Sequence, residues 1–147
     1  EIPLYVRSFV NPTAEGSAVC NVPELEPKVP CFILKKDQIL LSLSSRDFSF
    51  IVEEGISYIF KSLHKAQMKV SVIQNSAISF SVCVDNRFDT LAELLEKLEE
   101  RFKVSVTEKV TLYTIRHATP AAIQTVETGK TVLLKQVAAD TVQIVVA

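Results

Sequence analysis

Two runs of alternating apolar and polar residues in the middle of the chain constrain its fold most. The first covers residues 70–73, and in the second, 78–84, every other residue is apolar. A period of two is typical of a β-strand with one buried face. The connection between them, QNSA at 74–77, is polar and uncharged and lacks the Asn-Gly or Asp-Gly pair of a minimal hairpin. Two interpretations stay open: a plain turn, or a place where backbone and amide groups meet a small ligand.

Helical periodicity on both sides of these strands predicts two helices. One is expected over about 52–67 and the other over 90–102, where five apolar side chains form a single stripe with Glu and Lys opposite. If both helices cover the sheet, we expect their apolar residues to be buried against the strands: Ile56, Phe60, Leu94 and Leu98 against Val72, Phe80 and Val82.

The rest of the chain completes a recognisable order of elements. A strand is expected in the first ten residues, and a proline-rich arm follows. Residues 31–45 hold two short apolar runs broken at 35–38, which predicts a hairpin or a strand pair. Residues 103–117 are strand-like, 120–129 helical, and 130–147 form two strands, of which the last, TVQIVVA, is expected to be an exposed edge. The order β-α-β-β-α-β, then α-β-β, matches the ferredoxin-like arrangement followed by part of a second copy. The expected class is α+β, with antiparallel sheets and helices on one face.

Composition excludes several classes of partner. Sixteen basic and seventeen acidic residues nearly cancel in 147 residues, which argues against nucleic acid because phosphate binding needs a basic face. No apolar run approaches the roughly 20 residues that span a bilayer, so no membrane association is expected. The first residue is Glu1 and no signal peptide is visible, so we expect a fragment of a longer protein. Three widely spaced cysteines are interpreted as reduced thiols in a cytoplasmic protein, with Cys83 packed as a small hydrophobe.

Groups that catalyse reactions are not visible in the sequence. The three glycines are scattered, so no phosphate-binding loop is predicted. His64 and His117 are 53 positions apart and are interpreted as surface residues, although His117 lies at a strand end where it could face a ligand. The acidic residues of 93–100 form the polar face of a helix. We therefore expect no activity from this chain alone, no metal site and no cofactor.

Three stretches resemble one protein family. IPLYVRSFVNPTAEGSAV (2–19) resembles the end of an aspartokinase catalytic domain. VSVIQNSAISFSVCVD (70–85) resembles the second and third strands of an ACT domain, a small-molecule sensor attached to many biosynthetic enzymes. VTLYTIRHATPAAIQTV with VLLKQVAADTVQIVV resembles the carboxy-terminal part of single-function aspartokinases. The resemblance implies three parts: 1–30, the end of a kinase-domain strand and a proline-rich linker; 31–103, a first ACT domain; and 104–147, a second, partial ACT unit.

The resemblance also implies a function. Aspartokinases carry two ACT units after the kinase domain, bind lysine or threonine as feedback inhibitors, and use ATP and magnesium in the kinase domain to phosphorylate the aspartate side chain. This chain is then expected to be the regulatory region, with an amino-acid effector, with the kinase domain of the same parent chain as partner, and as a homodimer through its ACT sheets. The alternative is a ligand-free structural dimerisation domain.

In ACT units the ligand lies where the loop before the first helix meets the second strand. Carried onto this sequence, the resemblance places the effector among Ser45, Asp47, Ser49, Phe50, Ile51, Val70, Ser71, Gln74, Asn75 and Ser76. Asp47 is the expected partner of the effector ammonium, and backbone amides at the start of the helix are expected to attract the carboxylate. Relatives often have Thr-Ser-Glu where this chain has Asn75-Ser76-Ala77. The acidic residue is lost at Ala77, so lysine, threonine and no effector all remain open.

Overall fold

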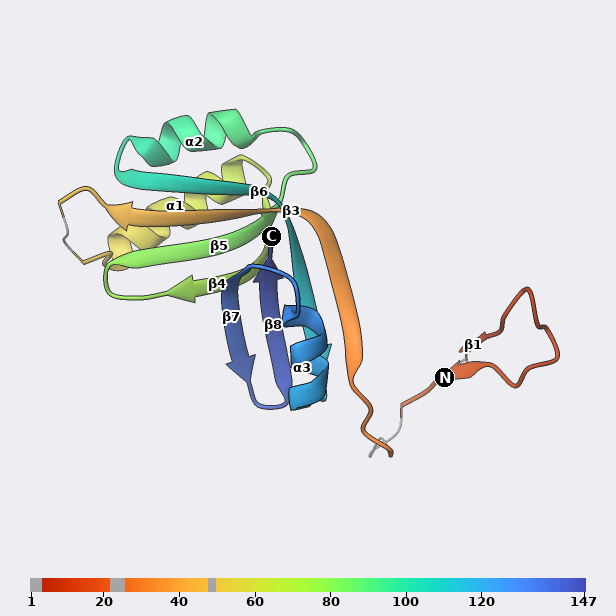
Figure 1. The fold of residues 1–147 in the computed structure, drawn as a ribbon. Coiled ribbons are helices and arrows are strands. Elements are labelled where there is room, and N and C mark those ends of the chain that lie inside the picture. The colour runs from red at the N-terminus through yellow and green to blue at the C-terminus, as the bar shows by residue number, and fades with distance from the viewer. Residues whose placement is uncertain (1–3, 22–25, 48–49) are drawn as a thin grey trace.

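The structure is a computed structural model that describes residues 4–21, 26–47 and 50–147. Its described part holds a small two-stranded sheet, a six-stranded antiparallel sheet and three helices (Figure 1). Leu4–Val6 (β1) pairs with Ser17–Val19 (β2). The larger sheet has the order β4-β5-β3-β6-β8-β7. In chain order its elements are β3 (Cys31–Ser45), α1 (Glu53–Lys65), β4 (Lys69–Asn75), β5 (Ser79–Asp85), α2 (Leu91–Glu99), β6 (Phe102–Arg116), α3 (Pro120–Glu127), β7 (Val132–Ala138) and β8 (Thr141–Val146).

The predicted α+β ferredoxin-like class is confirmed. β3-α1-β4-β5-α2-β6 is the βαββαβ unit, and α1 and α2 cover the same face of its strands (Figure 1). The following elements repeat the first part of that unit, because β6-α3-β7-β8 has the same strand order, β7-β8-β6, as β4-β5-β3. β6 runs through the expected boundary at 103/104, and the start of β3 pairs with the end of β6, from Cys31 with Arg116 to Lys35 with Leu112. β3 and β6 therefore run through both halves of the sheet, and the division of the chain into two ACT units stays a prediction.

The predicted hairpin or strand pair over 31–45 is wrong, because β3 is one continuous strand. The interruption at 35–38 is an irregularity in its pairing with β6, with register shifts on both sides of Gln38, and Asp37 has a φ of 54°. Lys109 of β6, with a φ of 56°, lies beside it. These register shifts arise where one strand has an extra residue opposite its neighbour (a β-bulge), which bends the strand and increases its twist. Beyond the bends, β7 and β8 run across the direction of β4 and β5 (Figure 1).

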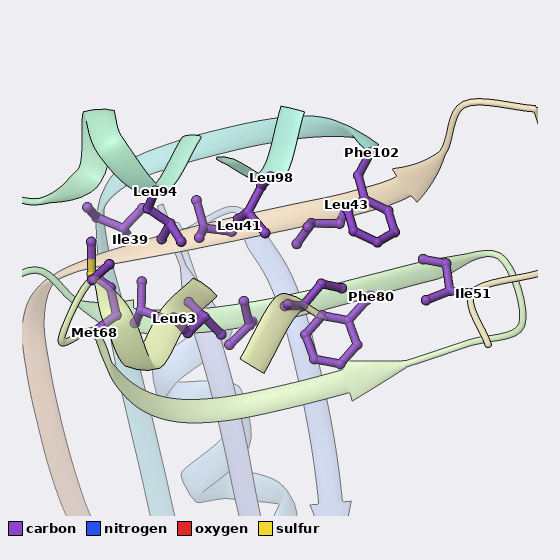
Figure 2. Close-up of a cluster of buried hydrophobic side chains, with 14 residues drawn as sticks. Ile39, Leu41, Leu43, Ile51, Leu63, Met68, Phe80, Leu94, Leu98 and Phe102 are labelled. Atoms are coloured by element: carbon purple, nitrogen blue, oxygen red, sulfur yellow. The ribbon is translucent and has the colours of Figure 1, made fainter. Parts of the chain in front are cut away.

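The main hydrophobic core lies between the two helices and the sheet (Figure 2). Leu94 and Leu98 of α2 are 1% and 0% exposed, and Phe80 and Val82 of β5 are buried below them, as the apolar stripe predicts. Three residues predicted to be buried in this core differ from the prediction. Ile56 is only half-buried against it. Val72 is buried on the opposite face, because the β4–β5 pairing shifts register between Val70 and Val72. Phe60 is 39% exposed and makes an edge-on ring contact with Phe80.

A second cluster joins the two halves on the face that carries no helix of the first unit. It contains Cys83, whose complete burial raises the pKa of its thiol to about 11, so the group is neutral and packs as the expected small hydrophobe. The remaining members come from five different strands: Leu40, Val72, Val110, Leu112, Leu134 and Val145. A third cluster lies beneath α3 and includes Ile115, Val126 and Ile144. The strand predicted to be an exposed edge, β8, lies between β6 and β7, so the edges of the sheet are β4 and β7.

Ala139 in the β7–β8 hairpin offers a test of this fold. The two-residue connection Ala139-Asp140 follows the pair Ala138 and Thr141, and Ala139 has a φ of 51°. A left-handed conformation costs a residue with a Cβ about 1–2 kcal/mol. Ala139→Gly is expected to raise the free energy of unfolding by about 0.5–1 kcal/mol in urea denaturation. Ala138→Gly, in the strand itself, is expected to lower it by a similar amount; equal effects from both substitutions would contradict the turn.

Candidate functional site

The loop between β3 and α1 forms one wall of a cleft of ≈ 350 Å³. Four of the predicted effector residues, Ser45, Asp47, Phe50 and Ile51, line it. The volume is at the lower end of the range of small-molecule sites, about 300–1,000 Å³, and suits a ligand the size of an amino acid. Ser49 lies outside the described residues. The other lining residues, which sequence reasoning missed, are Arg46, Val52, Gly55, Arg101 and Phe102.

Hydrogen bonds from Ile51 and Arg46 attach this loop to the rest of the first unit. The backbone N–H of Ile51, which is buried, donates to the carbonyl of Ala77 at 2.9 Å, so the loop meets the β4–β5 connection there. The Arg46 guanidinium donates to the backbone carbonyl of Glu99 at the end of α2. The loop is therefore in contact with both the polar QNSA connection and the second helix.

The predicted residues from β4 lie in three different environments. Val70 is half-buried against the main core. Ser71 faces the other side of the sheet, where its hydroxyl accepts from Lys35 Nζ at 3.0 Å and donates to Gln38 Oε1 at 3.3 Å. Gln74 and Asn75 are exposed at the end of the edge strand.

Ser76 is engaged inside the β4–β5 connection. Its hydroxyl lies 2.6 Å from that of Ser79 and accepts from the Ser79 N–H at 3.1 Å. The structure thus gathers the loop residues around one cleft, and the QNSA connection reaches them through the contact of Ile51 with Ala77. A role of the β4 residues in effector binding stays a prediction.

Charges of both signs surround the cleft. Arg101 is held by Glu54, with N and O 3.4 Å apart, and its guanidinium lies 4.3 Å from the centre of the Tyr58 ring. With Asp47 and Arg46, the cleft offers one carboxylate and two guanidinium groups beside apolar walls. Such a set can pair with both charges of a zwitterionic amino acid. Arg46 adjoins the predicted residues in sequence, whereas nothing in the pattern signals Arg101, which is 54 positions from Asp47.

The second unit repeats the loop contact with an added side-chain hydrogen bond. The N–H of Ala118, in the loop before α3, donates to the carbonyl of Asp140 in the β7–β8 hairpin at 2.8 Å, which is the counterpart of Ile51 with Ala77. His117 Nδ1 lies 2.7 Å from Asp140 Oδ2 and is 19% exposed, so it is less exposed than the sequence suggested. The hydrogen bond from His117 lowers the pKa of the Asp140 carboxyl. In the second unit, therefore, the His117–Asp140 side-chain contact lies where the loop before α3 meets the β7–β8 hairpin.

Among residues 4–21, 26–47 and 50–147, no cluster of three or more His, Cys, Asp or Glu side chains has the geometry of a metal site. Within the same ranges, no helix is long and apolar enough to cross a bilayer.

Comparison with known proteins relates this fold to others. No protein-family model matches the chain. The chain is 30% identical over 120 residues to lysine-sensitive aspartokinase 3 of Escherichia coli K12; the match covers 76% of this chain and 26% of that protein, about a quarter of its length. A solved structure described as a putative C-terminal regulatory domain of aspartate kinase from Porphyromonas gingivalis aligns with a TM-score of 0.66 at 16% identity, covering 80% of this chain and 86% of that chain.

A further structure, E. coli aspartokinase III in complex with lysine and aspartate, aligns with a TM-score of 0.72 at 23% identity, covering 98% of this chain and 35% of that chain. The chain thus has the α+β fold of ACT-type regulatory regions. Within that class, the resemblance to the C-terminal regulatory region of aspartokinases that the sequence predicts is confirmed.

Proposed function

We propose that this chain is the part of an aspartokinase that senses an end-product amino acid and transmits feedback inhibition to the kinase domain of the same parent protein. Lysine is the favoured effector and threonine the second candidate. The parent kinase would phosphorylate the aspartate side chain with ATP and magnesium in the cytoplasm. The observation that supports this most is a cleft of amino-acid size, lined by charges of both signs, at the loop where ACT-type folds are expected to bind ligands.

The proposed binding mode follows from the chemistry of that loop. Asp47 pairs with the effector ammonium, and the first-turn amides of α1 attract the carboxylate, since the N-cap residue Val52 makes no side-chain cap hydrogen bond to them. Phe50 and Ile51 supply apolar contact. The exposed end of β4, with Gln74 and Asn75, supplies neutral hydrogen-bonding groups from the other side of the loop.

The proposed signal is a shift of the β3–α1 loop. Ile51 connects the loop to the β4–β5 connection, and Arg46 connects it to the end of α2. An effector that rearranges the loop changes both contacts, and thereby the exposed edge β4. That edge is the proposed site of homodimer formation between ACT sheets, since an unpaired edge strand offers free backbone groups to a partner.

Isothermal titration of the purified chain with lysine, threonine and methionine tests the proposal. Saturable heat with at least one of them, with a dissociation constant in the micromolar to millimolar range, is expected. Comparing lysine with methionine shows whether the charge of the side chain is recognised, because the methionine side chain is apolar and similar in length to that of lysine. Absence of binding by all three would support the alternative, a ligand-free dimerisation domain.

A further inference from the structure

A groove of ≈ 780 Å³ runs between α1 and α2 on the outside of the helix layer. Its apolar part includes the ring of Phe60, which is 39% exposed, beside the buried residues Leu94 and Ala66. Apolar surface rimmed by polar residues is a feature of interaction sites. The surrounding residues here are Ser57, Tyr58, Lys61, Ser62, His64, Lys65, Glu93, Glu96 and Lys97.

The charges along the two sides of the groove are opposite in sign. α1 contributes Lys61 and Lys65, one turn apart, and α2 contributes Glu93 and Glu96. Within the described part of the chain, none of these four side chains forms an ion pair or hydrogen bond. The additional lysine on α2, Lys97, is already paired with Glu100 at 2.8 Å. The groove therefore has a basic side and an acidic side, both available to a partner.

This arrangement is complementary to itself. A two-fold axis along the groove places α1 of one copy over α2 of the other. The lysines of each copy then face the glutamates of its partner, twice in one interface, as a two-fold interface requires. Phe60 of each copy lies against the apolar groove of the other. We propose that a second copy of this chain docks on this groove, through a face different from the β4 edge.

The size of the helices predicts a weak contact. At 1.5 Å per residue, α1 and α2 are about 20 Å and 14 Å long, so the face buries less than the roughly 1,200 Å² of a standard interface. Pairs of exposed charges are screened by salt. We expect association that depends on concentration and weakens when salt is raised from about 0.05 M to about 0.5 M.

Sedimentation equilibrium with paired charge reversals tests the proposal on the whole chain. The variant K61E/K65E makes both sides of the groove acidic, and E93K/E96K makes both basic. Each is expected to self-associate through this face at least tenfold more weakly than the wild type. A mixture of the two variants is expected to associate again, because every facing pair is then opposite in charge.

The variant K28E/K36E is the matched control, since it changes the net charge as K61E/K65E does but lies outside the helices; it should associate like the wild type. Circular dichroism checks that every variant is folded. The β4-edge pairing of the proposed function does not involve these four side chains, so it is expected to be the same in all variants and to set the baseline particle size. The proposal is overturned if the two double variants associate as tightly as the wild type, or if their mixture associates no better than either alone.

Discussion

Leu98→Ala is expected to lower the free energy of unfolding by about 2–5 kcal/mol. Leu98 is fully buried and lies in the middle of the main core, where α2 packs on the sheet (Figure 2). The substitution removes three carbon atoms from a site closed on all sides, so the loss of apolar burial is increased by the cavity that remains. Urea denaturation, followed by circular dichroism and extrapolated linearly to water, measures the change.

Glu99→Ala is the control for this experiment, because it replaces the next residue of the same helix on the exposed side. It is expected to change the free energy of unfolding by less than about 0.5 kcal/mol. If Leu98→Ala and Glu99→Ala shift the midpoint equally, α2 does not pack on the sheet through its apolar stripe, and the layered architecture is wrong.

The second large effect is expected at Asp47. If its carboxylate pairs with the effector ammonium, Asp47→Ala should weaken effector binding by at least tenfold, since removing one partner of a desolvated charge pair costs about 2–5 kcal/mol. Asn75→Ala should cost only about 1 kcal/mol, the net worth of a neutral hydrogen bond. Titration calorimetry measures both. In the full parent enzyme, both substitutions should relieve feedback inhibition and leave turnover without effector unchanged.

Two further variants serve as controls: one separates charge from shape at Asp47, and the other removes a carboxylate outside the cleft. Asp47→Asn keeps the size of the side chain and should lose nearly as much affinity as Asp47→Ala. Glu108→Ala removes an exposed carboxylate near the bend of β6, outside the cleft, and should bind effector like the wild type. Unchanged binding by Asp47→Ala together with complete loss in Asn75→Ala would show that the ammonium partner is assigned incorrectly. If neither substitution matters, QNSA is a plain turn.

Local periodicity was sufficient to predict most of the elements and their order. The apolar stripe of α2 and the alternating apolar residues of β5 indicate which side chains are buried, because each element presents one apolar face to the core. Burial of Leu94, Leu98, Phe80 and Val82 follows directly from that pattern. Four residues that line the cleft, Ser45, Asp47, Phe50 and Ile51, were also predicted, because the resemblance to ACT units points to the loop before the first helix.

The tertiary structure alone decided the features that depend on pairing between distant strands. The break at 35–38 has the composition of a turn, yet β6 pairs with β3 on both sides of it, so the chain continues as one bent strand. A shift of one residue in the β4–β5 pairing moves Val72 to the opposite face, which no local pattern reveals because register belongs to the pair of strands. Arg101 reaches the cleft only because α2 ends beside the β3–α1 loop.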